Sequence, residues 1–436
     1  MASEMQTSET LNEQGLNEKK RKWGLIGYEN RVLIILCFAF GFVFVDRMAI
    51  ATLFPFMQDE LHLNNTDLGV LSGALAITWS LSGPLLGWVT SRVKKIVPFF
   101  AILILIFSLL SFTAGLVATF AALLILRGAM GIVEGPTLPI AQGIMSAESS
   151  EKRRGFNMGL LQTTSPSLLA TTLAPIALVA IASHLNWRYG FYLTIIPGLL
   201  IVLASLYFFD EPKKVHVSTV ISSEQEEKIT FVDCLKFKNL WLCLLGACCM
   251  VTWYIVIVTF APTYFVDTVG MTPAKMGLAV AMLGVGGMIW GTAVPTVSAW
   301  LGRKPMVIIA CVVGIFSPLA IIYLHSISFA LLAIILIIVH MGQGAHPLLF
   351  SVIPSETVSQ KYIPAAVGLV MGVGEFVGGF IMPIVAGAAA DHISTSAPFY
   401  IAAVAAVLGA LVALGLTETH PRHAKEAAPV LATEAA

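Results

Sequence analysis

The feature that most constrains this chain is a series of apolar stretches, each about twenty residues long, that recurs along most of its length. A helix needs about 20 consecutive apolar residues to cross the hydrocarbon core of a membrane. About twelve candidate spans begin near Val32, Asp67, Ile96, Ala121, Gly155, Tyr189, Leu240, Pro273, Pro305, Phe329, Ile363 and Pro398. Only 11% of the residues are charged, whereas soluble domains carry about 25%. We therefore expect an all-α membrane protein.

A polar segment in the middle of the chain divides the spans into two sets of six. The expected organisation is a tail (1–30), a six-helix bundle (31–209), a central loop (210–238), a second six-helix bundle (239–417) and a second tail (418–436). The loops after spans two and eight are alike. In each, small residues lead into a basic turn, starting from Gly83 and from Gly291, 208 residues apart (291 minus 83). Such a duplication predicts two pseudo-symmetric bundles with a substrate site between them.

Basic residues gather on one side of the expected spans. Most of the 25 lysine and arginine residues fall in the two tails, the central loop and the turns on the same side. Because cytoplasmic loops carry the excess of basic residues, both termini are expected in the cytoplasm. The expected location is the cell membrane, as a multi-pass protein of a bacterial inner membrane. The six cysteines fall in spans or on this side, so no disulfide framework is expected.

Two charged pairs lie inside the expected spans. Asp46 and Arg47 are adjacent near the middle of the first apolar run, and Arg127 and Glu134 are seven residues apart in the fourth. An ionisable side chain at the membrane centre costs roughly 2.5–3.5 kcal/mol on insertion scales, so it needs a partner or a water-filled cavity. Four such groups in one half of the chain predict a polar cavity with a function.

The spacing of these residues indicates how they are used. Arg127 and Glu134 lie on one helix face, about 10 Å apart. Arginine can bond both oxygens of a carboxylate, and burial disfavours the charged form of Glu134. The alternative is a structural Arg–Glu pair.

Asp46 and Arg47 diverge by about 100° around the helix, so one should face the cavity and the other a neighbouring helix. The alternative is that this pair caps a break in the helix.

Other spans hold further candidates for contact with a substrate or a proton. The fifth span is rich in hydroxyl and amide groups, and the eleventh has an acid among glycines. Aromatic and imidazole side chains could stack on or cap a substrate. For every one of them the alternative is hydrogen bonding or packing within the bundle. These candidates are Gln162, Trp79, Tyr254 and His346 for the substrate, Glu375 for a proton or the substrate, and His340 for a proton relay.

Several motifs resemble those of a known family. The two basic turns resemble the loop signature of the major facilitator superfamily, and Trp187-Arg188-Tyr-Gly-Phe191 resembles its usual start of the sixth span. Asp46-Arg47 and Arg127-x3-Gly131-x2-Glu134-x4-Pro139 resemble motifs of its anion:cation symporter family. That family includes bacterial galactonate, glucarate and hexuronate proton symporters and animal phosphate, sialate and vesicular glutamate carriers.

The resemblance implies the major facilitator fold with alternating access. It also implies that Arg47 contacts a substrate carboxylate and that Asp46 carries a proton. The chain departs from the pattern at the basic turns, where Ser91 and Ala299 replace the usual acid, and at Phe44, where members often carry tyrosine.

The expected function is import of an organic anion (a carboxylate, sugar acid or related acid) by proton symport. Arg47 and Arg127 would bind the anion, and Asp46, Glu134 and Glu375 would carry protons. The alternatives are proton-driven efflux of drugs or other amphiphiles, and transport of phosphate or its esters. No motif indicates an enzyme, a cofactor or a metal site, and the net charge of zero argues against nucleic-acid binding. The expected partners are a small organic anion, protons and the lipid bilayer, with the protein acting as a monomer.

Overall fold

The computed structural model describes residues 27–90, 93, 95–150, 153–212, 236–359 and 362–420. Most of both expected tails and of the central loop lies outside the described residues, as do Ser91 and Arg92 of the first basic turn.

The first half of the chain is a run of helices with two short π-helical segments. Its elements are α2 (Tyr28–Leu61), α3 (Asn65–Thr90), α4 (Ile96–Ala114), α5 (Phe120–Glu134), α6 (Thr137–Glu148), α7 (Arg154–Gly159), η1 (Leu160–Thr164), η2 (Ser167–Leu173), α8 (Ala174–His184), α9 (Trp187–Tyr192) and α10 (Ile195–Phe208).

The second half of the chain is also a run of helices interrupted by short π-helical and 3-10 segments. Its elements are α12 (Lys238–Thr263), η3 (Tyr264–Thr268), α13 (Pro273–Leu301), α14 (Arg303–Gly314), α15 (Phe316–Tyr323), α16 (Phe329–Val339), η4 (His340–Gly344), α17 (Ala345–Pro347), η5 (Leu348–Val352), α18 (Ile353–Thr357), α19 (Ile363–Gly374), η7 (Glu375–Ile381), α20 (Met382–His392) and α21 (Ala397–Leu414).

Eleven helical segments of the described chain are long and apolar enough to cross a membrane. The 26-residue helix α3 packs among them, mainly against α5. Each of these twelve elements begins within four residues of a start that the apolar stretches predict. The expected all-α membrane fold is therefore confirmed.

Proline and glycine divide several spans into shorter elements. Gly135 and Pro136 separate α5 from α6, so Glu134 is the last residue of α5, at the break in the fourth span. Proline removes a backbone donor and its ring crowds the preceding turn, and π-helical segments lie next to Pro166 and Pro347. Polar side chains, among them Glu134 and His346, lie beside these breaks.

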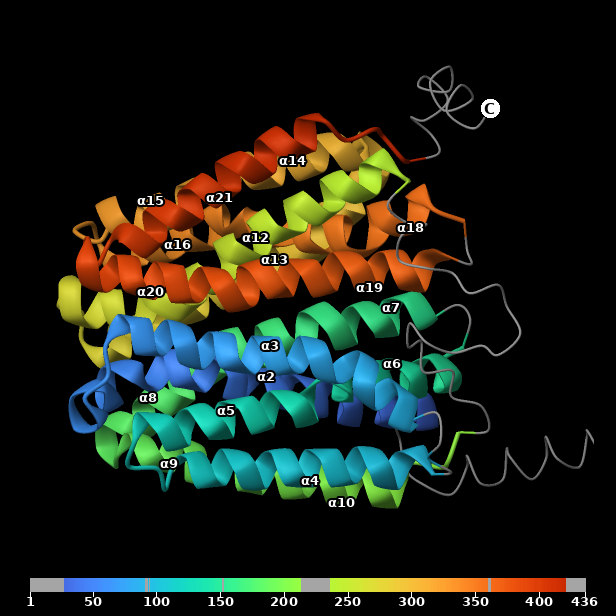
Figure 1. The fold of residues 1–436 in the computed structure, drawn as a ribbon, viewed down its shortest axis with the longest axis horizontal. Helices are drawn as coiled ribbons and strands as arrows, with labels where there is room; N and C mark the ends of the chain where they lie inside the picture. The colour runs from blue at the N-terminus through green and yellow to red at the C-terminus, as the bar shows by residue number, and fades with distance from the viewer. Residues whose placement is uncertain are drawn as a thin grey trace, which may run out of the picture.

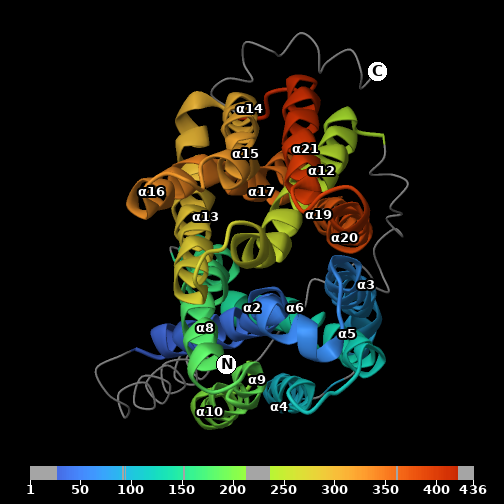
Figure 2. The same cartoon turned by 90° about the vertical axis from the view of Figure 1, so that its left-hand side faces the viewer.

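The helices form two groups that pack side by side. In Figure 1 the blue-to-green helices α2 to α10 lie below the yellow-to-red helices α12 to α21. Viewed along the helices, α2 faces α12, α3 lies beside α20, and α8 lies below α13 (Figure 2). These six helices, with η2 and η7, therefore make the interface between the bundles.

Two acids show that the bundles repeat each other in detail. Glu211 accepts hydrogen bonds from the first backbone amides of α4, at Ile96 and Val97. Glu418 does the same for α14, at Arg303 and Lys304. The two acids and the two helix starts are each 207 residues apart (418 minus 211, 303 minus 96). Anionic side chains stabilise helix N-termini, so each half uses the acid after its last span to fix its third span.

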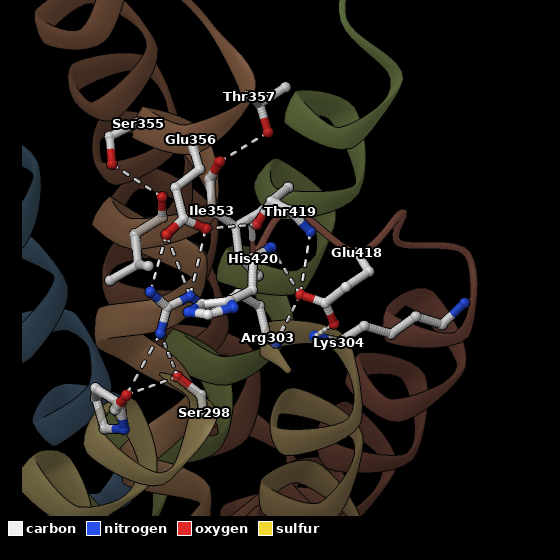
Figure 3. Close-up of polar contacts among 12 residues, drawn as sticks. Ser298, Arg303, Lys304, Ile353, Ser355, Glu356, Thr357, Glu418, Thr419 and His420 are labelled. Carbon is white, nitrogen blue, oxygen red and sulfur yellow. Dashed lines mark hydrogen bonds and ion pairs between the residues drawn. The ribbon is translucent and has the colours of Figure 1, made fainter. Parts of the chain in front are cut away.

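We call the side of the bundles where Tyr28 and Thr417 lie the tail side. There the second basic turn is held by acids from other elements (Figure 3). Arg303 pairs with Glu356 at 2.9 Å and donates to Ser298 Oγ at 2.7 Å. Thr419 also donates to Glu356, at 2.6 Å. Although Ala299 replaces the usual acid, Glu356 and Glu418 supply carboxylates to this turn.

We call the opposite side, where Leu61 and Asp391 lie, the distal side. There the bundles are joined by hydrogen bonds. The carboxylate of Asp391, on α20, accepts four hydrogen bonds of 2.6–3.1 Å from the backbone and side chains of Asn65 and Thr66. Gln58 donates to Asp267 at 2.8 Å. These contacts join the two bundles on the distal side.

Candidate functional site

Asp46 and Arg127 form an ion pair inside the first bundle. Arg127 Nη1 lies 3.2 Å from Asp46 Oδ2, and the side chains of Arg127 and Asp46 are 1% and 0% exposed. Arg127 also donates to the backbone carbonyls of Asp46 and Arg47, at 3.3 and 3.2 Å. Ser111 donates to the second carboxylate oxygen of Asp46. In this state, therefore, Asp46 and Arg127 tie α2 to α4 and α5.

Arg47 points to a different partner, as its 100° separation from Asp46 predicts. Its Nη2 atom lies 2.9 Å from Glu375 Oε2 on η7, so this ion pair joins the two bundles. The guanidinium also lies over the rings of Phe44 and Trp79, at 5.7 and 5.8 Å from the ring centres. Cation–π contacts of this kind stabilise a desolvated guanidinium. Two of the expected substrate contacts, Arg47 and Trp79, are therefore adjacent.

Glu134 is a buried acid without a hydrogen-bond partner among the described residues. Its side chain is 1% exposed, and neither carboxylate oxygen has a hydrogen-bond donor. Asp46, Arg127 and Arg47 are the charged groups whose fields act on it. Because an ionised carboxylate buried without a hydrogen bond is costly and tends to neutralise, the geometry favours a protonated Glu134. The expected alternative of a structural Arg127–Glu134 ion pair does not occur, since Arg127 pairs with Asp46.

A small cavity between the bundles connects the two arginines. Its volume of about 10 Å³ holds about one water molecule. This cavity is therefore too small to hold an organic acid in this structure. Both bundles line it, through Arg47, Met48, Ala51, Ser72, Arg127, Ile255, Thr259 and Gly379.

The second bundle contributes an aromatic and polar group near Arg47. Tyr254 on α12 lies within electrostatic range of Arg47 and Glu375. The His346 ring is 5.7 Å from that of Tyr254 and 5.4 Å from that of Phe350. His346 is 9% exposed, and neither ring nitrogen has a partner in hydrogen-bond geometry, although the backbones of Gln343 and Met250 are near. The His346 ring therefore packs against two aromatic side chains of the second bundle, with its nitrogens buried.

His340 and Gln162 lie in other surroundings. His340 Nδ1 is 3.1 Å from Ser317 Oγ, and its ring packs 4.8 Å from that of Trp253, which suits a structural contact within the second bundle. Gln162 is exposed on η1 and is not among the residues that line the cavity in the described part of the chain.

The sequence did not single out three hydroxyl groups at this site. Ser111 binds Asp46, and Ser72 and Thr259 line the cavity. The signal for Ser111 was its position inside the apolar run of α4, where an unsatisfied hydroxyl is unfavourable. Ser72 and Thr259 carried no signal, because serine and threonine also bond to their own helix backbone.

Close packing of α3 on α5 holds this charged cluster in place. A Cβ atom on Gly131 of α5 would overlap Thr78 Oγ1 and the carbonyl oxygen of Leu75 on α3. A Cβ on Gly128, one turn earlier, would meet only Thr78 Cγ2, at 3.9 Å. Small residues let membrane helices approach each other closely. Gly131 is thus the position at which α5 requires the absence of a side chain.

The fold and site define a multi-pass membrane protein of the transporter class, with charged groups buried inside the first bundle and at its boundary with the second. The family model of the Major Facilitator Superfamily matches residues 36–381. The chain therefore belongs to the major facilitator superfamily, a family of transporters and not of enzymes.

Several curated proteins are similar in sequence. A probable sulfoacetate transporter of Cupriavidus necator is 24% identical over 60% of this chain and 63% of its own length. A hexuronate transporter of Bacillus subtilis is 24% identical over 62% of this chain and 65% of its own. An efflux pump of Aspergillus brasiliensis is 26% identical over 49% of this chain and 37% of its own. The chain thus matches less than two thirds of the length of these relatives.

A solved structure shows the same fold. A bacterial homologue of the human lysosomal transporter Spinster, crystallised in an inward-facing and unoccupied conformation, superimposes with a TM-score of 0.71. The match covers 90% of this chain and 98% of that one at 16% identity, so it shows the fold alone.

Proposed function

We propose that this protein is a secondary active transporter that imports a small organic anion together with protons. The observation that carries the proposal is the position of Arg47. It is a buried cation at the boundary between the bundles, bound to a carboxylate of the opposite bundle. The guanidinium of Arg47 already binds one carboxylate, so its N–H donors have the geometry to bind the carboxylate of a substrate.

The charged cluster suits an anion better than a cation. Arg47 and Arg127 both border the cavity, and arginine stays charged under all physiological conditions. The names of the sulfoacetate and hexuronate transporters support an organic acid as the substrate. The aromatic rings of Phe44, Trp79 and Tyr254 beside Arg47 suit the uncharged part of such an acid.

Direction and location follow from the basic residues. By the sequence, most of the lysines and arginines fall in the tails, the central loop and the turns that join spans on the tail side, so we place this side in the cytoplasm. The distal side, closed by Asp391, then faces outwards. Import begins when that side opens, and the closed cavity corresponds to a state with the outer side shut. With a bacterial inner membrane, an inward proton gradient supplies the free energy.

Two rival functions share parts of this site. Proton-driven efflux uses buried acids as well, but two arginines at the cavity would repel cationic drugs. Phosphate or phosphate esters would bind arginines as readily as carboxylates do.

Uptake and competition measurements distinguish import of an organic acid from drug efflux and from phosphate transport. Proteoliposomes with an inward proton gradient would be offered labelled hexuronates, short sulfonates, benzoate, phosphate and a cationic dye. We expect uptake of one class of acid, inhibited by its own unlabelled members. Uptake of phosphate alone, or extrusion of the dye without uptake of any acid, would contradict the proposal.

A further inference from the structure

The described part of the buried cluster contains two cations and three acids, and each acid has a different environment. Arg127 is paired with Asp46, and Arg47 is paired with Glu375. Glu134 has no partner. An unpaired buried charge is strongly unfavourable. When Glu134 is protonated and the other four groups are charged, the two positive and two negative charges cancel and the cluster is neutral.

We infer that Glu375 occupies the place of the substrate carboxylate on Arg47, and that it takes up one proton for each monoanion that displaces it. The inference rests on the proposed function, whose coupling residue it names. A monoanion that binds Arg47 brings one negative charge into a closed cavity. Protonation of the released Glu375 removes one, so the cluster remains neutral. One O–H bond forms on Glu375, and no electrons are transferred.

The positions of the three acids assign the proton to Glu375. Asp46 is fully buried and held by Arg127 and Ser111 within its own bundle. Glu134 has no cation to give up to a substrate. The Glu375 side chain is 16% exposed and lies on the interface between the bundles. It is therefore the acid that a substrate can displace and that a proton can reach.

The surroundings of Glu375 contain few other charges. Arg47 faces it from α2 and Tyr254 from α12, with His346 beside Tyr254. The described charged groups of α3 and α20 are Asp67, Asp391 and His392, at the distal ends of those helices. The described residues of α19 include no ionisable side chain. Arg47 is thus the described cation that pairs with Glu375.

The pair also has a mechanical consequence. While Glu375 is bound to Arg47, the two bundles are tied together at mid-membrane. A substrate that replaces Glu375 breaks this tie and is itself bound by Arg47. In an empty carrier Glu375 is again bound to Arg47, so the carrier reorients without a proton on Glu375 and protons do not leak without substrate.

The test measures how many protons and charges move with each anion. Proteoliposomes would be given labelled glucuronate, or whichever monoanion of the panel above enters fastest, and a pH gradient would be opposed by a measured substrate gradient until net flux stops. For the unmodified protein we expect one proton per monoanion and no response of uptake to a membrane potential. A ratio of two or more, or current during uptake, would overturn the inference.

Glu375→Gln provides the second arm, because glutamine resembles the protonated acid. We expect this variant to keep the exchange of labelled for unlabelled anion but to lose accumulation driven by the pH gradient. Its uptake should now respond to a membrane potential, because the anion enters without a proton. Retained accumulation, or loss of exchange, would overturn the inference.

Glu356→Gln is the matched control. Glu356 belongs to the same bundle and pairs with Arg303 at the same distance of 2.9 Å, but on the tail side. We expect it to keep one proton per monoanion. Should the unmodified protein take up no acid of the panel, the proposed function itself fails, which is a different result from coupled uptake that survives Glu375→Gln.

Discussion

Arg47 on α2 and Glu375 on η7 are bound at 2.9 Å, although they are separated by 328 residues and belong to different bundles. The ion pair therefore joins the two bundles and does not lie within one of them. Asp46, the neighbour of Arg47, is instead paired within the first bundle. Two adjacent residues thus have different partners: Asp46 pairs within the first bundle, whereas Arg47 lies at the boundary between the bundles, where we propose that the substrate binds.

The buried pair of the first bundle should be sensitive to the loss of one partner. Arg127→Gln leaves the Asp46 carboxylate buried without its cation, and we expect a loss of about 3–5 kcal/mol in the free energy of unfolding. The double substitution Asp46→Asn with Arg127→Gln should recover part of that loss, because no isolated charge remains. Denaturant unfolding in detergent measures both.

The control for that cycle is an exposed ion pair. Arg153 lies 3.8 Å from Glu29, with side chains 42% and 22% exposed, and such pairs contribute about 0–1 kcal/mol. Arg153→Gln should therefore have a small effect. Equal losses from Arg127→Gln and Arg153→Gln would show that the buried pair is not needed for stability.

The contact between α3 and α5 gives a second prediction. Gly131→Ala forces a methyl group against Thr78 and Leu75, and overpacking of this kind costs about 1–3 kcal/mol. We expect a lower melting temperature and slower uptake, because α5 carries Arg127 and Glu134. Gly128→Ala, on the same helix with its nearest atom at 3.9 Å, should change neither by a comparable amount. Similar behaviour of both variants would contradict this account of the packing.

The twelve spans could be predicted from the sequence, because a helix that crosses a membrane needs an apolar run of about 20 residues. The charged residues at depth were accessible for the same reason, since Asp46, Arg47, Arg127 and Glu134 interrupt such runs. Their partners were not. Helix periodicity gives the angle of a side chain but not the helix that it meets, so the pairing of Arg127 with Asp46 rather than Glu134 required the packing of α2 on α5.

The contacts between the bundles were the hardest features to predict from the sequence. Asp391 lies near the end of an apolar run, where an acid is ordinary, and only the docking of α20 on α3 shows its bonds to Asn65 and Thr66. Glu356 and Glu418 similarly appeared as separate acids in the sequence. They replace the acid missing at Ala299 only because three chain segments meet at Arg303.

The distal closure gives a third prediction. Asp391→Ala removes the acceptor of four hydrogen bonds between the bundles, so we expect the distal side to open more often. Ser72→Cys at the cavity, in a protein whose six native cysteines are replaced, would report this by faster reaction with an impermeant thiol reagent added from the distal side.

Glu60→Gln is the control for this experiment. Glu60 accepts hydrogen bonds from Trp187 and Arg188, which are within its own bundle, so its loss should leave the labelling rate unchanged. If Asp391→Ala labels no faster than the unmodified protein, Asp391 does not hold this side closed.

The most direct measurement is uptake of a labelled organic acid into proteoliposomes under an inward proton gradient, compared with Arg47→Gln. We expect accumulation of an acid that requires the gradient and is reduced at least about 100-fold by the substitution, as for loss of a buried charged contact of about 2.7 kcal/mol. The variant should remain folded, as judged by its elution in detergent. Full accumulation by Arg47→Gln, or uptake of no acid by the unmodified protein, would contradict the account.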